Sequence, residues 1–422
     1  MLLTGREGAD GERSASSPRA TATPTPTPPG DAAAPGPPPD TQVEETGGRL
    51  AVGITEPNPS FVWAPEDREV GGAFGRWRAA FARIRPAYYR LVLDWPSLQP
   101  SRGAPADLAI PNGGCLRDVE PCASWAGVRE QLEAAASRQR RTGMQVLVVV
   151  TGSPDWAARP AGGCERAGIA PRSRPPRAAA LEDYRRLVSD TLAAAREAGV
   201  ELRYWSAWNE PNHPYFLSPQ RRACAAGART AAVGPYVAMA RALREALDAA
   251  PGEQAYVIGE LAGLLRRKPQ STGVREFARA LPDELVCGAA AWTQHAYVPG
   301  PDPVDAAARG LASHRCDRAP EIWITETGVG AAKLGASRPA GEAAQRAACR
   351  AMDRRLRRWF EDPRVTAAFQ YTLREDDKFP TGLVKTRLDG AYPVLRAWER
   401  WGGSRPPGAA PPKAACGQTA RQ

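Results

Sequence analysis

The chain has 422 residues and a formal net charge of +10, with 56 Lys and Arg residues against 46 Asp and Glu residues. This length accommodates one large domain together with extensions. The basic residues are mostly single arginines with acidic residues interleaved, and no aromatic-basic motif typical of RNA or DNA binding is present. We therefore expect no nucleic-acid partner in spite of the positive charge.

Residues 1–48 differ in composition from the rest of the chain. They are rich in Pro, Thr, Ala, Gly and Ser and include Ala-Thr-Pro-Thr-Pro-Thr-Pro-Pro at positions 22–29. Such a segment cannot bury enough apolar surface to fold, so we expect a disordered tether. It is either a spacer that holds a domain away from a cell surface or simply an unstructured tail. The folded domain is then expected at residues 49–402, and a flexible C-terminal tail at residues 403–422.

Eight cysteines are many for a cytosolic protein. They show neither Cys-x-x-Cys spacing nor a Cys/His zinc cluster, and the chain has only three histidines, so we expect no metal site. We predict the disulfide Cys115–Cys122, whose cysteines flank a short loop. We also predict Cys164–Cys224, whose cysteines fall in successive loops beyond the third and fourth predicted strands. Buried unpaired thiols are the alternative.

Disulfides fit an exported protein, so we expect an extracellular or cell-envelope location. No secretory signal is visible, because Met1-Leu2-Leu3 is followed at once by Thr-Gly-Arg-Glu without an apolar core region. Either export uses a route that the sequence does not show, or the true start lies upstream. We expect no membrane span, since the best apolar run, at residues 146–150, has the length of a strand.

From Leu50 onward, strand and helix patterns alternate, which is typical of a parallel sheet. Strands are predicted at residues 50–55, 88–93, 145–150, 200–208, 256–259, 289–295, 321–325 and 367–372. Helices are predicted at residues 73–84, 125–142, 181–197, 236–249, 343–360 and 392–401. Gly143 and Gly199 directly follow two of these helices, as glycine commonly does. Eight strand–helix units in one chain predict a single closed (β/α)8 barrel.

Two of the predicted strands run into a glutamate. The fourth leads into Asn209-Glu210-Pro211-Asn212, where Pro211 has no amide to donate and restricts the residue before it. The seventh leads into Glu326. Either glutamate alone is more often a solvated loop charge. Two carboxylates on two strand ends, however, are what general-acid and nucleophilic chemistry on an acetal bond requires, so we interpret Glu210 and Glu326 as a catalytic pair.

These motifs resemble the fourth- and seventh-strand signatures of the clan A retaining glycoside hydrolases, which are (β/α)8 barrels. The likeness rests on Trp-Asn-Glu-Pro at positions 208–211 and Ile-Thr-Glu at positions 324–326, and it extends over roughly residues 50–402. Within the clan, the chain is most similar to the xylosidase-type family 39 and its relatives. The resemblance implies retaining hydrolysis of β-glycosidic bonds in an oligosaccharide, polysaccharide or glycoside, without a metal or organic cofactor. Glu210 would be the acid/base, its pKa raised by burial and by the nearby nucleophile, and Glu326 would be the nucleophile.

The resemblance also implies substrate-binding roles at other strand ends. Arg90 and Trp95 form an Arg-x-x-x-x-Trp pattern, in which Trp95 would contact the substrate. Arg90 would orient the nucleophile and keep it ionised; a structural ion pair is the alternative. His295 would line the sugar subsite and Tyr297 would hydrogen-bond the nucleophile, since alternation along a strand puts both on one face. Asn209 would bind the sugar 2-hydroxyl.

Other residues are assigned less directly. Trp156 follows the third strand and would either stack on a sugar ring or pack within its loop. Many relatives carry a Trp at the end of the eighth strand, where this chain has Tyr371 as the candidate substitute. Glu56 lacks a preceding Asn, and Glu260 ends the fifth strand, where the clan has no catalytic carboxylate. We therefore expect neither of these glutamates to be catalytic.

A catalytically inactive sugar-binding barrel that acts as a cell-envelope interaction protein is the alternative function. A binding protein needs no acid/base pair, so the presence of Glu210 and Glu326 together with Asn209 and Arg90 favours the hydrolase. In either case we expect a carbohydrate partner and a monomeric protein. The identity of the sugar, its linkage and the choice between internal and terminal cleavage stay open.

Overall fold

The computed structural model describes residues 50–115, 119–225, 227–266, 268–330, 338, 340–376, 379–403, 409–413 and 416–417. The predicted tether at residues 1–48 lies outside the described residues. In the part of the chain that is described, no helix combines the length and the apolar character needed to cross a membrane.

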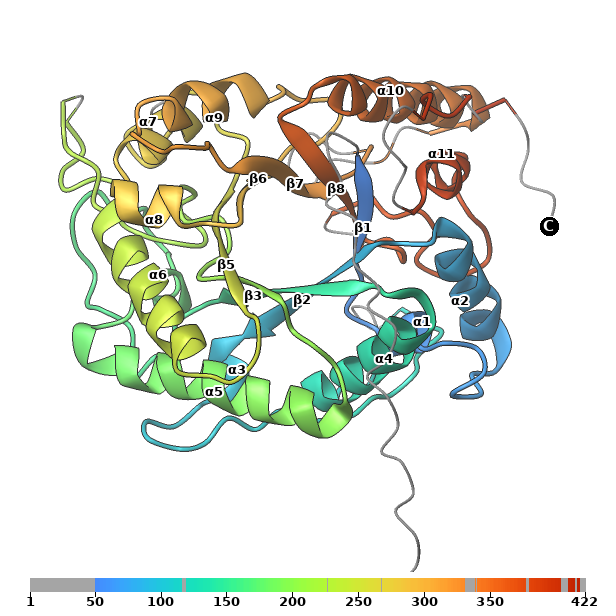
Figure 1. Ribbon diagram of the computed structural model, residues 1–422, viewed down its shortest axis with the longest axis horizontal. Helices are drawn as coiled ribbons and strands as arrows, with labels where there is room; N and C mark the ends of the chain where they lie inside the picture. Colours follow the sequence, from blue (N-terminus) through green and yellow to red (C-terminus); the bar gives the residue numbers. More distant parts are fainter. Residues whose placement is uncertain are drawn as a thin grey trace, which may run out of the picture. The chain divides into compact units, whose positions relative to one another are not determined.

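Eight parallel strands close into a barrel in chain order, with β1 hydrogen-bonded to both β2 and β8 (Figure 1). The strands are β1 (Ala51–Thr55), β2 (Tyr88–Asp94), β3 (Gln145–Thr151), β4 (Tyr204–Ser206), β5 (Ala255–Leu261), β6 (Ala291–His295), β7 (Glu321–Thr327) and β8 (Val365–Tyr371). All eight were predicted from the sequence, and the predicted (β/α)8 fold class is confirmed.

Helices follow the strands and form the outer layer, as Figure 1 shows for α2, α4, α5, α6 and α10. They are α1 (Pro59–Val62), α2 (Gly72–Ile84), α3 (Trp95–Leu98), α4 (Gly127–Thr142), α5 (Leu181–Ala198), α6 (Val233–Asp248), α7 (Val274–Arg279), α8 (Asp283–Cys287), α9 (Val304–Leu311), α10 (Glu342–Glu361) and α11 (Val394–Trp401). Two short 3-10 helices, η1 (Pro171–Ser173) and η2 (Ala178–Ala180), precede α5. The predicted ends of α4 and α5 are confirmed, because Gly143 and Gly199 adopt left-handed φ angles of 68° and 73° at their C-caps.

The fourth strand is much shorter than predicted. The sequence indicated a strand at residues 200–208, but only Tyr204–Ser206 pairs with both neighbouring strands. Beyond the strand, the chain stays attached through single backbone bonds, from Asn209 N–H to the Val150 carbonyl at 3.1 Å and from Glu210 N–H to the Glu260 carbonyl at 2.9 Å. Asn209 and Glu210 are thereby held at the barrel mouth without being part of the ladder.

Side chains fill the N-terminal half of the barrel interior. Tyr88 at the start of β2 and Tyr204 at the start of β4 pack against Trp323 of β7, with ring centroids 4.9 and 4.8 Å from the Trp323 ring. The same buried cluster contains Ala51, Leu147, Val149, Val257, Ala291, Ala367 and Phe369. This aromatic floor, defined by Tyr88, Tyr204 and Trp323, closes one end of the barrel, as is usual for eight strands.

Four disulfides connect the described cysteines: Cys115–Cys122, Cys164–Cys224, Cys287–Cys316 and Cys349–Cys416. The first two were predicted and are confirmed; the other two were not predicted. The fourth lies partly in the segment that was expected to be a flexible tail, of which only residues 403, 409–413 and 416–417 are described. Cys416 is bonded to Cys349 of α10, and the Pro412 carbonyl accepts a hydrogen bond from Arg357 of the same helix.

Candidate active site

Polar side chains from five strands meet above the aromatic floor. Arg90 lies two residues after Tyr88 on β2 and therefore points to the same inner face of the barrel. Asn209 and Glu210 follow β4, while the other members come from β5, β6 and β7 or directly after them: Glu260, His295, Tyr297 and Glu326. We call Arg90, Asn209, Glu210, Glu260, His295, Tyr297 and Glu326 the polar cluster.

Glu326 points into the barrel because β7 is irregular at its end. Strict alternation from Trp323 would place Thr325 inside and Glu326 outside. The pairing of β6 with β7 shifts by one residue between Gln294 and His295, so that His295 lies opposite Glu326. Irregularities of this kind commonly re-aim a side chain next to a functional site.

The structure brings Glu210 and Glu326 together, as the sequence predicted. Nδ1 of His295 lies 2.9 Å from Oε1 of Glu210 and 3.3 Å from Oε2 of Glu326. An oxygen of each carboxylate and this nitrogen all lie within 4.8 Å of one another. The Glu210 backbone has a φ of 43°, a left-handed conformation that typically costs a non-glycine residue about 1–3 kcal/mol and is common at functional sites.

Arg90 connects three members of the polar cluster. Its Nη1 lies 2.8 Å from Oε1 of Glu326, while its Nη2 donates to Oδ1 of Asn209 and to Oε2 of Glu260, both at 2.7 Å. The predicted proximity of Arg90 to Glu326 is therefore observed. Because Arg90 uses the Oδ1 of Asn209, the side-chain amide group of Asn209 is the part that can donate to a ligand.

Tyr297 contacts Glu326 as the sequence predicted. Its hydroxyl donates to Oε2 of Glu326 at 2.6 Å. Phe379 packs edge-on against both Tyr297 and Tyr371, with ring centroids 4.8 and 5.6 Å away. Tyr371 ends β8 and is partly exposed, so it remains a candidate for contacting a sugar.

Glu260 belongs to the polar cluster, which the sequence reasoning missed. Its side chain is completely buried, and its Oε2 lies 2.9 Å from Nε2 of His295 in addition to its contact with Arg90. Simple alternation from Val257 would point Glu260 out of the barrel, but β5 has a register shift between Ile258 and Leu261. Gly259, with a φ of 119°, sits at this shift and was the sequence signal that could have indicated it.

The charges of the polar cluster act on one another strongly. Burial lowers the pKa of His295, but the charges of Glu326, Glu210 and Glu260 outweigh burial and raise this pKa to about 10. Burial raises the pKa of Glu260, yet Arg90 and His295 prevail and lower it to about 2. The resting cluster thus pairs an imidazolium and a guanidinium with its carboxylates.

The expected pKa shift of Glu210 is wrong in direction for the resting protein. Burial does raise the pKa of Glu210, as predicted, but the hydrogen bond and the positive charge of His295 outweigh burial and lower it. Burial and the second carboxylate alone would raise this pKa, but the His295 cation at 2.9 Å reverses the shift. The proton that a general acid would need is therefore shared between His295 and Glu210.

Trp95 does not reach the site, which corrects its predicted role as a substrate contact. Its side chain is 0% exposed and packs edge-on against Trp156 and Tyr184, and its indole N–H donates to Gln99. Trp95 directly follows β2 as the first residue of α3, and alternation from Arg90 directs its side chain toward the helices. Trp156 is partly exposed, and its indole N–H donates to the Gln99 carbonyl. Of the two tryptophans, Trp156 therefore remains the candidate for stacking on a sugar ring.

Glu56 lies outside the polar cluster, as expected. Its carboxylate accepts backbone N–H bonds from Asn58 and Arg374, each at 3.0 Å, and so joins the end of β1 to the segment after β8. Burial raises the pKa of Glu56 to about 7, although these backbone bonds oppose the shift. We assign Glu56 to the support of the barrel rim.

An exposed aromatic ring follows Glu210 closely in the chain and was also missed. Tyr215 is 45% exposed, its hydroxyl accepts a hydrogen bond from Arg166 at 2.6 Å, and its ring lies 5.3 Å from the His213 ring. The Cys164–Cys224 disulfide joins the two loops that carry Arg166 and Tyr215. The sequence signal was a histidine and two aromatic residues just after the Asn-Glu-Pro motif.

A nitrogen of His295 and one carboxylate oxygen each of Glu210 and Glu326 form a group with the chemistry of metal ligands. However, each nitrogen of this imidazole already faces a carboxylate oxygen at 2.9 Å, which requires N–H donors rather than free lone pairs. Arg90 supplies the second positive charge. The donor set therefore fits a proton network better than a bound cation.

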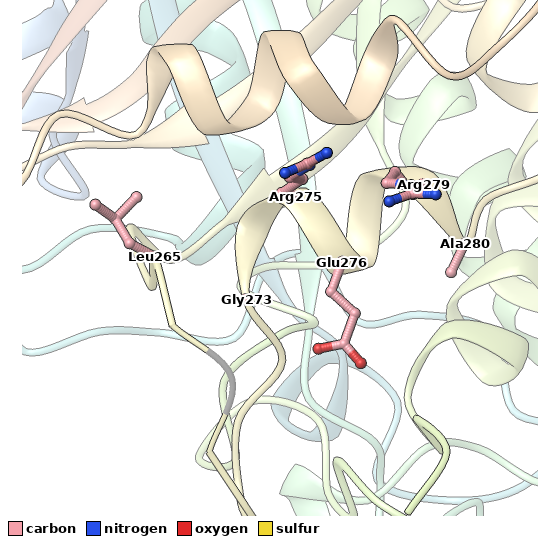
Figure 2. A pocket seen from close by; sticks show the side chains of 6 residues that line it. All are labelled: Leu265, Gly273, Arg275, Glu276, Arg279 and Ala280. Atoms are coloured by element: carbon pink, nitrogen blue, oxygen red, sulfur yellow. The ribbon is translucent and has the colours of Figure 1, made fainter. Parts of the chain in front are cut away.

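A surface hollow of about 550 Å³ lies elsewhere on the molecule, around α7 (Figure 2). None of the polar cluster lines this hollow. The lining residues are Leu265, Gly273, Arg275, Glu276, Arg279 and Ala280.

Comparison with known proteins gives a likeness in fold. A conserved exported protein from Bacteroides fragilis superimposes with a TM-score of 0.54 at 13% identity, covering 86% of this chain and 79% of its own. SrfJ from Salmonella typhimurium superimposes with a TM-score of 0.52 at 12% identity, and the match covers 83% of this chain and 74% of SrfJ. The catalytic domain of the family 30 xylanase C from Talaromyces cellulolyticus superimposes with a TM-score of 0.50 at 13% identity. This match covers 85% of this chain and 76% of the xylanase domain.

These identities speak for the fold alone. The chain spans only 64% of the length of a family 39 glycoside hydrolase from Bacteroides cellulosilyticus WH2, to which it is 16% identical at a TM-score of 0.48. Neither a protein-family model nor a curated protein matches the sequence. The predicted (β/α)8 barrel fold is thus confirmed by these likenesses.

Proposed function

We propose that the protein hydrolyses β-glycosidic bonds with retention, with Glu210 as the acid/base and Glu326 as the nucleophile. The observation that carries this proposal is the approach of the two carboxylates from β4 and β7, whose oxygens lie within 4.8 Å of each other. Retaining glycosidases have carboxyl groups about 5–5.5 Å apart, whereas inverting enzymes need about 6.5–9.5 Å to admit a water. The 4.8 Å limit applies to one oxygen of each carboxylate, and oxygens this close are consistent with the shorter, retaining spacing.

In the first step, the Glu326 carboxylate forms a bond to the anomeric carbon as the bond to the leaving-group oxygen breaks. Arg90 and Tyr297, which contact the two oxygens of Glu326, orient the carboxylate for this attack. Nδ1 of His295 passes its proton to Glu210, and Glu210 passes it on to the leaving-group oxygen, so that His295 ends neutral and Glu210 ends ionised. The electrons of the broken bond remain on the leaving group, which departs as a neutral alcohol.

Charge is conserved in the cluster during this step. At rest, three carboxylates face two cations, Arg90 and His295, which gives −1. In the covalent intermediate, Glu326 is an uncharged ester and His295 is neutral, while Glu210, Glu260 and Arg90 keep their charges, which again gives −1. The cluster therefore never holds an additional uncompensated charge while buried, which would be costly.

In the second step, Glu210 accepts a proton from water, and the resulting hydroxyl group attacks the anomeric carbon and releases Glu326. The proton returns to the pair of Glu210 and His295. Asn209 is the proposed donor to the sugar 2-hydroxyl, and Tyr371 and Trp156 are the remaining candidates for contacts with the sugar rings. The leaving group would lie on the side of Glu210.

The proposed compartment is extracellular or cell-envelope, and the substrate class is carbohydrate. The four disulfides support this location, because disulfides persist in oxidising compartments.

A panel of chromogenic aryl β-glycosides, xylans and glucans tests the proposal. Hydrolysis of at least one β-linked substrate, with the β-anomer of the product appearing first by NMR, is the expected result. Product lengths at early times then separate internal from terminal cleavage. Sugar binding without turnover on the whole panel would instead favour the inactive carbohydrate-binding protein.

A further inference from the structure

We propose that Glu260 is a positioning residue that keeps His295 protonated at both nitrogens, so that His295 can hold and supply the proton used by Glu210. For its kinetic consequence, this inference rests on the proposed hydrolase function. Its structural part, the protonation state of His295, stands independently of that function.

The geometry defines a chain of three groups from the barrel interior to its mouth. Oε2 of Glu260 lies 2.9 Å from Nε2 of His295, and Nδ1 on the other side of the ring lies 2.9 Å from Oε1 of Glu210. A carboxylate oxygen is an acceptor only, so each ring nitrogen must carry a hydrogen when both carboxylates are ionised. The ring is therefore held as an imidazolium between two acceptors.

Glu260 cannot itself contact a substrate. Its side chain is 0% exposed, and its backbone N–H donates to Oγ1 of Thr293 on β6 at 2.6 Å. Arg90 holds the same Oε2 at 2.7 Å. Glu260 therefore acts on the chemistry through His295, which in turn contacts the carboxylate at the barrel mouth.

The charged and titratable groups around His295 come from most of the barrel strands. Three carboxylates and one guanidinium lie in direct contact or one step away, and the remaining neighbours are phenols and a second imidazole. They are Arg90 from β2, Glu210 and His213 after β4, Glu260 from β5, Tyr297 after β6, Glu326 from β7 and Tyr371 from β8. Among these, Glu260 is the acceptor that faces Nε2, so its charge decides whether that nitrogen keeps its hydrogen as the other proton leaves.

The substitution Glu260→Gln keeps the shape of the side chain and removes its charge. In this variant His295 loses one carboxylate partner while Arg90 remains, so the His295 imidazolium is less stabilised. We expect His295 to titrate at least one pH unit lower than in the wild type. The proton shared with Glu210 is then lost at a lower pH.

Nitrogen-15 NMR of histidine side chains in the full-length protein measures this directly. The chain has three histidines, His213, His295 and His314, so the spectrum is simple, and His295→Gln assigns the signal. The wild type should show two N–H groups on His295 at pH 8, and Glu260→Gln should shift its titration to lower pH. Glu56→Gln is the matched control, because it removes another buried carboxylate at a strand end without touching His295, and it should leave that titration unchanged.

A neutral His295 at pH 8 in the wild type, or an identical titration in Glu260→Gln, would overturn the inference. The signals of His213 and His314 report whether the variant keeps its fold. If Glu260→Gln does not fold, the wild-type spectrum still decides, since a single N–H on His295 contradicts the proposed state.

The kinetic part uses the pH profile of kcat/KM on a substrate that the wild type hydrolyses. Loss of the shared proton should set the basic limb, and Glu260→Gln should move that limb to lower pH, whereas Glu56→Gln should not. A purely structural role for Glu260 would reduce activity at every pH without moving the limb. A wild type without hydrolase activity would refute the proposed function but would leave the NMR result standing, so the two failures are distinguishable.

Discussion

Arg90 Nη1 lies 2.8 Å from Glu326 Oε1, and this contact joins β2 to β7 across the interior of the barrel. The same guanidinium also binds Glu260, and the Arg90 side chain is only 1% exposed. Removing it would leave two carboxylates in a low-dielectric interior without their partner. Breaking a buried ion pair in this way commonly costs about 3–5 kcal/mol.

Arg90→Leu should therefore lower the free energy of unfolding by about 3–5 kcal/mol at pH 7, measured by denaturant titration. Arg83→Ala is the control, because Arg83 is half exposed in its pair with Glu399 and such surface pairs are worth about 0–1 kcal/mol. Equal small losses in the two variants would contradict the role assigned to Arg90.

Glu56 should make stability depend on pH below neutrality. Its pKa is about 7 in the folded protein against 4.5 when unfolded, so the folded state binds more protons between these values. The free energy of unfolding should consequently fall as pH rises from 4.5 to 7, by about 3 kcal/mol at 1.36 kcal/mol per pH unit. Glu56→Gln should abolish this slope in urea titrations at several pH values. If the slope persists unchanged in the variant, the pH dependence of stability arises from other groups and not from Glu56.

The Cys164–Cys224 disulfide should stabilise the two loops next to Glu210. It closes a loop with a sequence separation of 60 residues, for which chain entropy predicts about 4 kcal/mol. Replacing both cysteines by alanine should lower the free energy of unfolding toward that amount. The Cys115–Cys122 pair, separated by 7 residues, should contribute only about 2–3 kcal/mol. Non-reducing peptide mapping checks the pairing, and free thiols in oxidised protein would contradict it.

Glu210→Ala should reduce turnover by about 10²–10⁴-fold on substrates with poor leaving groups, because no group then protonates the departing oxygen. The loss should be much smaller on an activated aryl glycoside, whose leaving group departs without a proton. Added azide should restore part of the activity by attacking the covalent intermediate, with a β-glycosyl azide as product. An α-glycosyl azide, or equal losses on both substrates, would argue against Glu210 as the acid/base.

The strands could be predicted because their apolar composition follows directly from burial on both faces. Glu210 and Glu326 could be placed at strand ends because each comes at the end of such an apolar run. Glu260 was not predicted as an inward-facing residue, because a register shift on β5 reverses its side of the sheet and only Gly259 signals that shift in the sequence. A shift of one residue is a property of strand pairing, which alternation along a single strand does not contain.

Trp95 was misassigned for a different reason. Counting alternately from Arg90 would have placed this side chain among the helices, but the motif resemblance was preferred to the count. The pairings Cys287–Cys316 and Cys349–Cys416 depend on how α8, α10 and the C-terminal segment approach other parts of the chain. Such long-range approaches are set by tertiary packing, which spacing in the sequence does not determine.

Covalent labelling with a slow-deacylating 2-fluoro β-glycoside tests the central claim most directly. A sugar class that the wild type hydrolyses is chosen for the reagent, and the trapped protein is digested and mapped by mass spectrometry. We expect one sugar bound to Glu326 and none elsewhere, with labelling absent in Glu326→Ala. A label on Glu260 or Glu56, or an inverted first product by NMR, would contradict the assignment of Glu326 as the nucleophile.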